Sequence, residues 1–461
     1  MTPRPTLGLV PLDERPVCLE QPRLLAQDAG YRVLTPPARL LGRFQVPGDG
    51  EAVARWLAAN FAKADAWAVS LDMLAYGGLV ASRRLGKPAP ACLRPLRALS
   101  LARRLRPEAP VCGFQAIRRR SVTVSSRGDL ALWRRLHEDD AGLSAHRRRN
   151  HLVNLAAVGL LADGALDWLL LMQEDATARG AHKDEQTALK RRARELGAAD
   201  RLFLGAGTDE AAAVALARLD CALKRRRPRV KAVYSSAAGS RRIAPYEDRP
   251  LCRTLAGQVA AAGASLCRRN ADLELWAWCP DRAPADHALG RSGRRSSPAQ
   301  AERFCRAIAA ALKRGAAVAV ADVADANGAD PEFSQALARR APLRRLSGYA
   351  AWNTAGNALG WALAQGLLGA GSPRGLALRL CDDWGYQSVC RAKLSALAEK
   401  LGADPWSFDE PARRALERAL RAELGGWTRR TLGRHFTAAE LPRRFSLPWS
   451  RLFEARISWT S

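Results

Sequence analysis

The sequence predicts an α/β protein built on parallel strands. Short apolar runs alternate with longer stretches of helical periodicity along most of the chain, and this alternation indicates β–α–β units. Some runs, such as Trp168–Met172, are apolar throughout, which is typical of a sheet covered on both faces. The expected strands are Leu7–Pro11, Tyr31–Leu34, Ala66–Leu71, Val111–Gln115, Trp168–Met172, Arg201–Leu204, Val230–Ser235, Leu273–Cys279, Ala316–Ala321 and Tyr349–Trp352.

Helical periodicity fills the intervals between these strands. Because ten strands exceed the eight of a (β/α)8 barrel, the count leaves two architectures open. We expect a decorated barrel of that type, with two doubly wound sheets as the alternative. The clearest helices are expected at Glu51–Ala62, Ser125–His137, Asp184–Leu196, Asp209–Leu219, Gln300–Lys313 and Thr354–Gly366.

The chain divides into two expected regions. Residues 1–371 carry the strand–helix alternation and form the expected α/β catalytic domain. Residues 372–461 show helical patterns without a clear strand, so we expect a C-terminal helical region packed on that domain. Within the first region, Asp281–Ser297 is rich in Pro, Gly, Ala and Arg and predicts a long loop.

The net charge of +28 is the most unusual bulk property. Only nine of the 73 basic residues are lysine, and the arginines are scattered through helical stretches rich in Ala and Leu. No basic run alternates with aromatic residues, as a groove for single-stranded nucleic acid would require. A compositional preference for arginine explains the charge more simply than a specific nucleic-acid partner, although polyanions should bind nonspecifically at low salt.

The sequence indicates a cytoplasmic protein. It shows no export signal, and no apolar run reaches the ~20 residues that a membrane helix needs. The ten cysteines occur singly, without a Cys-x-x-Cys pair, which disfavours a zinc site and favours reduced, mostly buried thiols.

Acidic and amide residues follow many of the predicted strands. In parallel α/β folds this end of the sheet binds ligands. After the first strand come Asp13, Glu14 and Arg15, which either bind a polar ligand or pair with one another to shape the loop. After the third come Asp72 and Tyr76; a carboxylate at the end of an apolar strand is costly to bury unpaired.

The fifth strand carries the strongest signal, because it ends in Glu174 and Asp175. Adjacent carboxylates suit acid–base chemistry, since their mutual repulsion separates their pKa values. The alternative is that Asp175 caps the following helix. After the sixth strand, Asp209 and Glu210 lie where helix capping also explains acidic residues.

Amides follow the later strands. Asn327 lies in the segment Ala321–Asp330, which is rich in aspartate but lacks the glutamate and spacing of an EF-hand loop. Trp352, Asn353 and Asn357 follow the last strand. Amides can hydrogen-bond sugar hydroxyls and an indole can stack on a sugar ring, whereas the alternative places the indole in the core and an amide at a helix cap.

Motifs of several other enzyme classes are absent. The sequence has no Gly-x-Ser-x-Gly elbow, no phosphate-binding Gly-x-x-x-x-Gly-Lys loop and no His-Glu-x-x-His pair. This absence leaves the carboxylates at the strand ends as the main chemical signal.

With these motifs assembled, the sequence resembles the bacterial family of unknown function 4127 along nearly its whole length. The family pattern has Asp-Asp where this chain has Asp13-Glu14 and Glu174-Asp175. The similar segments are Val10–Val17, Ser70–Leu79, Gln173–Thr177, Thr208–Ala211, Ala321–Asp330, Ala351–Gly360 and Pro448–Glu454.

The chain also resembles, more weakly, barrel β-N-acetylglucosaminidases of the O-GlcNAcase and hyaluronidase type. The resemblance lies in the adjacent acids Glu174 and Asp175 and in the later Trp-containing segment with Asn353 and Asn357. It implies that Glu174 orients the acetamido group of the substrate and that Asp175 donates the proton.

Three functional hypotheses follow. The leading one is a hydrolase that cleaves a glycosidic bond, with an N-acetylhexosaminide as one candidate substrate, with Glu174 and Asp175 as the catalytic pair and with no cofactor. Its partner is a small carbohydrate or glycoconjugate, and no membrane or specific nucleic acid is expected. The residues expected to bind substrate are Asp13, Glu14, Arg15, Asp72, Tyr76, Asp209, Glu210, Asn327, Trp352, Asn353 and Asn357.

The second hypothesis is a metal-dependent hydrolase acting on a phosphate-bearing substrate. In it, Asp13, Asp72, Asp322 and Asp325 gather Mg²⁺, Mn²⁺ or Ca²⁺. The third is a noncatalytic protein that binds polyanions through its positive charge.

Overall fold

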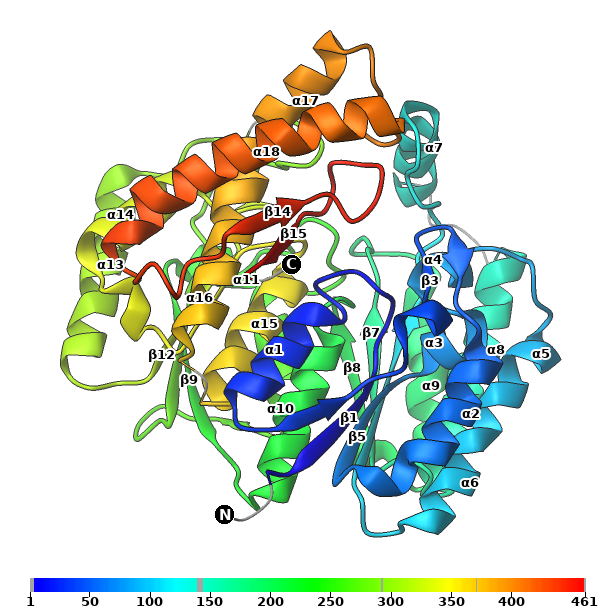
Figure 1. Cartoon of the computed structure of the whole chain (residues 1–461). Coiled ribbons are helices and arrows are strands. Elements are labelled where there is room, and N and C mark those ends of the chain that lie inside the picture. The colour runs from blue at the N-terminus through cyan, green and yellow to red at the C-terminus, as the bar shows by residue number, and fades with distance from the viewer. Residues whose placement is uncertain (1–3, 139–143, 292, 370, 460–461) are drawn as a thin grey trace.

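The structure is a computed structural model that describes residues 4–138, 144–291, 293–369 and 371–459 (Figure 1). Its first sheet has six strands, and each neighbouring pair is parallel. From edge to edge these strands are β2 (Arg32–Leu34), β1 (Thr6–Val10), β5 (Ala66–Ser70), β6 (Val111–Ile117), β7 (Trp168–Gln173) and β8 (Leu202–Ala206).

The second sheet has five strands, also parallel, and repeats the order of the first. In both sheets the second strand along the chain lies at an edge beside the first, and the later strands continue on the other side. From edge to edge the strands are β10 (Ser265–Leu266), β9 (Arg229–Tyr234), β11 (Leu273–Trp278), β12 (Val318–Asp322) and β13 (Gly348–Ala350).

The two large sheets of the described residues are therefore open, and the expectation of a closed barrel is corrected to the alternative of two separate parallel sheets. The physical reason lies in two helices that separate the sheets. Helix α10 (Ala211–Leu223) packs on β5 and β6, helix α15 (Ala355–Leu367) packs on β12 and β13, and the two helices pack on each other. Figure 1 shows them in the centre, between the sheets.

The central helices are almost entirely apolar and are buried on nearly all sides. Every residue from Ala211 to Cys221 is buried, as expected for a helix with no face toward solvent. Glycines allow the close approach of α15: a Cβ at Gly356 would lie 2.3 Å from the carbonyl oxygen of Ala206, and one at Gly360 would lie 2.4 Å from Cγ of Glu210.

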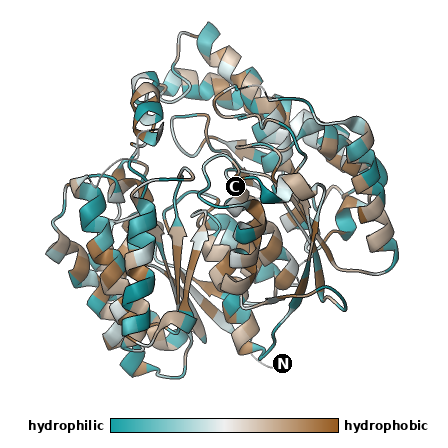
Figure 2. Cartoon of the chain, turned by 180° about the vertical axis from the view of Figure 1, so that it is seen from behind, coloured by the Kyte–Doolittle hydropathy of each residue, from teal (hydrophilic) through white to brown (hydrophobic). Residues whose placement is uncertain are grey.

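Each strand of the first sheet contributes to two cores. In β7, Leu170 and Met172 pack with α10 in the central core, while Leu169 and Leu171 belong to a second core on the opposite face. This burial on both faces explains the uninterrupted apolar sequence of the strand. Figure 2 shows the resulting hydrophobic strands inside and the more hydrophilic outer helices.

The remaining helices cover the outer faces or connect the strands. They are α1 (Glu20–Asp28), α2 (Gly50–Asn60), α3 (Leu71–Tyr76), α4 (Leu79–Ser82), α5 (Ala89–Leu93), α6 (Arg97–Leu105), α7 (Arg127–Glu138), α8 (Ala145–Ala162), α9 (His182–Glu195), α11 (Ala237–Arg241), α12 (Leu251–Ala261), α13 (Pro298–Lys313) and α14 (Pro331–Arg340).

The C-terminal region is mainly helical, as expected. It contains α16 (Pro373–Arg379), a π-helical segment at Leu380–Cys390, α17 (Arg391–Lys400) and α18 (Glu410–Thr431). It also contains a short antiparallel pair, β14 (Arg444–Ser446) and β15 (Arg456–Ser458), which the helical patterns of this region did not indicate. Their short sequences give little signal, and β14 packs on α18.

Other predictions concern individual segments. All ten predicted strands are present, with ends displaced by a few residues. The described residues of Asp281–Ser297 contain no helix or sheet strand, as expected for a loop. All ten cysteines are free and eight are buried. Across the described residues, no helix has the length and apolar character needed to cross a membrane.

Candidate active site

A pocket lies where the carboxyl ends of the two sheets meet the C-terminal region. It encloses about 800 Å³ of space not filled by atoms, part of it open to solvent. Both sheets contribute, which agrees with ligand binding at the carboxyl ends of parallel strands. Its polar lining residues are Arg15, Arg83, Arg119, Thr123, Glu174, Asp175, Thr208, Asp209, Tyr246, Asn327, Asn353 and Arg451.

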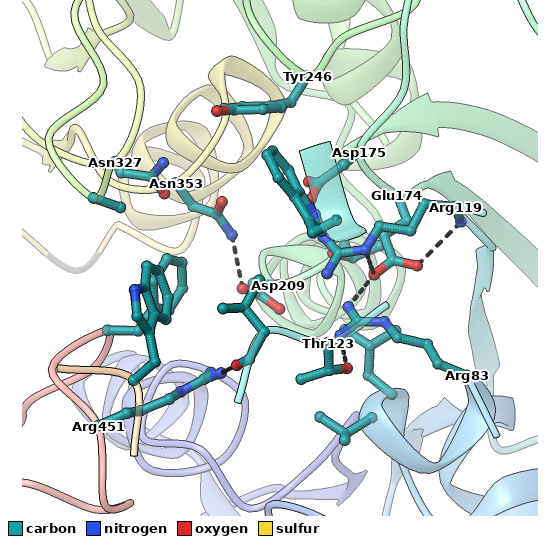
Figure 3. Close-up of a pocket in the computed structure, with 18 of the residues that line it drawn as sticks. Arg83, Arg119, Thr123, Glu174, Asp175, Asp209, Tyr246, Asn327, Asn353 and Arg451 are labelled. Atoms are coloured by element: carbon teal, nitrogen blue, oxygen red, sulfur yellow. Dashed lines mark hydrogen bonds and ion pairs between the residues drawn. The ribbon is translucent and has the colours of Figure 1, made fainter. Parts of the chain in front are cut away.

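Glu174, directly after β7, lies at one end of the pocket and is held by arginines (Figure 3). Its side chain is only 2% exposed; it forms an ion pair with Arg83 and accepts the backbone N–H of Arg119 at 3.2 Å. Burial alone would raise the pKa of Glu174, but Arg83, Arg119 and Arg118 outweigh it and lower the pKa to about 2. Glu174 is therefore an anion at any physiological pH.

Asp175 is the most accessible carboxylate of this pocket. Its side chain is 19% exposed, against 2% for Glu174 and 3% for Asp209. Asp175 forms an ion pair with Arg119, whose Nε also lies 3.6 Å from Oε1 of Glu174. Arg119 therefore links the two predicted catalytic carboxylates.

A second buried carboxylate, Asp209 after β8, lies across the pocket from this pair. Arg15 donates to both of its oxygens, with Nη2–Oδ1 at 2.6 Å and Nη1–Oδ2 at 3.1 Å. Asn353 also donates to Oδ2, at 2.9 Å (Figure 3). Burial raises the pKa of Asp209, and the nearby Arg15 opposes that effect. The contact joins residues 194 positions apart and ties the loops after β1 and β8 together.

The two pocket amides have an unusual backbone conformation. Asn327 and Asn353 have φ values of +58° and +66°, in the left-handed region that asparagine tolerates better than most residues. The backbone N–H of Asn327 donates to the carbonyl oxygen of Asn353 at 2.9 Å. This contact fixes the loops after β12 and β13 against each other, so both amides face the pocket.

The connection between β14 and β15 supplies aromatic side chains to the pocket. It contributes Trp449 and Phe453, with Arg451 between them. The guanidinium carbon of Arg451 lies 4.7 Å from the ring centroid of Trp449 and 5.2 Å from that of Phe453. Trp406 stacks on Phe453, with centroids 6.1 Å apart. Together these rings give the pocket an apolar wall.

Of the thirteen predicted site residues, the pocket brings together Arg15, Glu174, Asp175, Asp209, Asn327 and Asn353. Three others lie directly behind it. Asp13 pairs with Arg15 at 2.8 Å, Glu14 accepts the indole N–H of Trp449 at 2.5 Å, and Asn357 accepts the backbone N–H of Asp209 at 2.9 Å. These three residues orient pocket residues from outside the lining.

The other four predicted residues lie away from the pocket lining. Asp72 is fully buried in α3, where burial raises its pKa to about 7, and Tyr76 of the same helix accepts a hydrogen bond from an asparagine of α8. Glu210 is buried at the start of α10, and burial raises its pKa to about 8. Trp352 is 3% exposed and lies in the central core.

The four aspartates of the metal hypothesis have other partners. Asp13 pairs with an arginine, Asp72 and Asp322 accept backbone N–H groups, and Asp325 pairs with Arg282 at 2.6 Å. In the part of the chain that the structure describes, no group of three or more His, Cys, Asp or Glu residues is arranged to hold a metal ion.

Sequence reasoning identified Arg15 but missed the other arginines and the aromatic residues of the pocket. Arg83 follows Ser82 near the third strand, Arg119 belongs to the run Arg118–Arg120, and Trp449 and Arg451 lie in the segment Pro448–Glu454. The available signal was position: Arg83 and Arg119 follow strands, as the predicted acids do. In a chain with so many arginines, their residue type alone carried little information.

Comparison with known proteins places the chain in a family. A search among curated proteins finds no match. The model of one protein family, described as "Protein of unknown function (DUF4127)", matches residues 7–139 and 138–458. This match covers both sheets, the residues that line the pocket and most of the C-terminal region. The chain therefore belongs to the DUF4127 family of proteins of unknown function.

Proposed function

We propose that the protein is a hydrolase that cleaves a glycosidic bond in this pocket. The observation that carries the proposal is the gathering of Glu174, Asp175 and Asp209 around one pocket together with two amides and an aromatic wall. Glycoside hydrolysis needs one carboxyl group to transfer a proton and a second to stabilise or attack the developing cation. The proposal rests on this pocket, since the two open sheets remove the support that a barrel would have lent.

The environments of the carboxylates suggest their roles. Glu174, held as an anion by Arg83 and Arg119, is suited to orient the substrate or stabilise positive charge that develops at the sugar ring. Asp175 is assigned the proton transfer, because its side chain is the most exposed of the three. This division matches the roles that the resemblance to N-acetylglucosaminidases implies.

The rest of the pocket suits a polyhydroxylated ring. Asn327 and Asn353 offer amide groups, which act as both donors and acceptors toward hydroxyl or acetamido groups. Trp449 and Phe453 offer apolar faces on which the C–H side of a sugar ring can pack. Polar groups that fix orientation beside apolar walls are the usual composition of a small-molecule site.

The test is a hydrolysis screen of the purified protein against aryl glycosides, including N-acetylhexosaminides, with and without chelator. We expect turnover that resists chelator and falls at least 100-fold in Asp175→Asn, since general acid–base groups contribute roughly 10²–10⁴-fold. Asp163→Asn is the matched control, because Asp163 is an exposed carboxylate at the end of α8.

Two results would contradict the proposal. Turnover of a confirmed substrate that survives Asp175→Asn would remove Asp175 from the mechanism. Activity that chelator abolishes and added Mg²⁺ or Mn²⁺ restores would favour the metal-dependent hydrolase instead.

A further inference from the structure

Four arginines gather at the Glu174 end of the pocket, and we name them the arginine cluster: Arg83, Arg118, Arg119 and Arg149. Arg83 and Arg119 line the pocket, and both turn toward Glu174 in Figure 3. Arg118 and Arg149 lie behind them, and both donate to the backbone carbonyl oxygen of Ser82. Arg118 is fully buried and Arg149 is 6% exposed.

Within the described residues, the positive charge of the cluster exceeds the negative charge of the carboxylates that pair with it. Among the described residues, Glu174 pairs with Arg83 and Arg119, and Asp175 pairs with Arg119. In the described part of the chain, Arg118 forms no ion pair with a carboxylate, although Glu174 acts on it electrostatically, and its Nε and Nη2 are buried without a hydrogen-bond acceptor. Among the residues that the structure describes, Arg149 donates to carbonyl oxygens, those of Lys87 and Ser82. Among the described residues, four guanidinium groups thus gather around the paired carboxylates Glu174 and Asp175.

This positive charge contributes to lowered pKa values of nearby groups. Burial, then Arg118, Arg149 and Arg147, lower the pKa of His146 to about 4. Burial also lowers the pKa of Arg118 to about 9, with Arg83 adding to the effect. A buried excess of charge is costly, so an anion at this end of the pocket would be stabilised.

We propose that the arginine cluster binds an anionic group of the ligand, and that the substrate is an acidic sugar whose carboxylate lies against Arg83, Arg119 and the hydroxyl of Thr123. Thr123 already accepts a hydrogen bond from Nη1 of Arg83 at 2.5 Å and lines the same wall. Guanidinium groups bind oxyanions through paired N–H donors. The sugar identity rests on the proposed function, whereas anion binding does not require hydrolysis.

Binding measurements test the inference without turnover. Calorimetric titrations would compare D-glucuronate, D-glucose and inorganic phosphate, which separate the sugar carboxylate from a free oxyanion. We expect glucuronate to bind at least tenfold more tightly than glucose, and Arg83→Gln to remove that preference. Arg135→Gln is the control, because Arg135 is an exposed arginine of the neighbouring helix α7. Thr123→Val, a mild change at the same wall, should weaken glucuronate alone.

Each outcome bears on the inference. Equal binding of glucuronate and glucose would overturn it, as would a preference that survives both Arg83→Gln and Thr123→Val in folded protein. Phosphate that binds more tightly than glucuronate would overturn the sugar carboxylate as the source of the anion. If glucuronate binds as expected but no glycoside is hydrolysed, the proposed function fails and the anion site stands.

Discussion

Replacement of Glu174 by glutamine should destabilise the protein by about 3 kcal/mol at pH 7. Burial would raise the pKa of Glu174, but its arginine partners outweigh burial and lower the pKa from the ordinary 4.5 to about 2. At ~1.4 kcal/mol per pKa unit, this difference corresponds to about 3 kcal/mol. Breaking a buried ion pair from one side typically costs about 3–5 kcal/mol, because the remaining charge loses its partner.

The pH dependence of this contribution has a definite sign. The folded pKa lies below the unfolded one, so the stabilisation is complete above pH 4.5 and declines as the pH falls toward 2. Urea denaturation of Glu174→Gln, followed by tryptophan fluorescence at pH 7, measures the loss of free energy of unfolding. Glu195→Gln is the control, since that carboxylate is 51% exposed and its surface pairs contribute at most about 1 kcal/mol. A loss below about 1 kcal/mol for Glu174→Gln would refute the reasoning.

Three further predictions concern other parts of the fold. Glu210→Gln should stabilise the protein more at pH 9 than at pH 5 in the same urea assay. Burial raises the pKa of Glu210 from 4.5 to about 8, so between these pH values the folded chain holds a proton that the unfolded chain has released, and the wild-type protein loses stability as the pH rises. Equal effects of the substitution at both pH values would contradict this. Asp49→Ala should cost about 1 kcal/mol, because Asp49 caps α2 by accepting the N–H groups of residues 51 and 52 at 3.1 and 3.0 Å. Gly356→Ala should lower the thermal unfolding midpoint clearly, since its Cβ would lie 2.3 Å from a backbone oxygen; an unchanged midpoint would show that the central helices can separate.

Local patterns in the sequence were sufficient to locate the strands, but they did not determine how the strands pair. Runs such as Trp168–Met172 are apolar in any parallel sheet covered on both faces, whether the sheet is open or closed. The deciding feature was the helix after Asp209. Its sequence from Ala211 to Cys221 is almost entirely apolar, whereas the outer helices of a barrel keep one face toward solvent. A helix of this kind indicates that it lies between two sheets.

The candidate site was predictable where it depended on position along the strands. Glu174, Asp175 and Asp209 follow strands and meet at one pocket, as expected from the geometry of parallel sheets. The aromatic wall was not predictable, because Trp449 reaches the pocket from the C-terminal strand pair and only tertiary contacts bring it there. Trp352, next to Asn353 in the chain, instead turns into the core.

The most direct test of the account is a crystal structure of Asp175→Asn with the aryl glycoside that the hydrolysis screen identifies as a substrate. The account predicts the sugar ring in the pocket, beside the aromatic wall and Asn353, with the glycosidic oxygen within about 3.2 Å of the side chain at position 175. A ligand bound outside this pocket, or a glycosidic oxygen beyond the reach of residue 175, Glu174 and Asp209, would contradict the central claim.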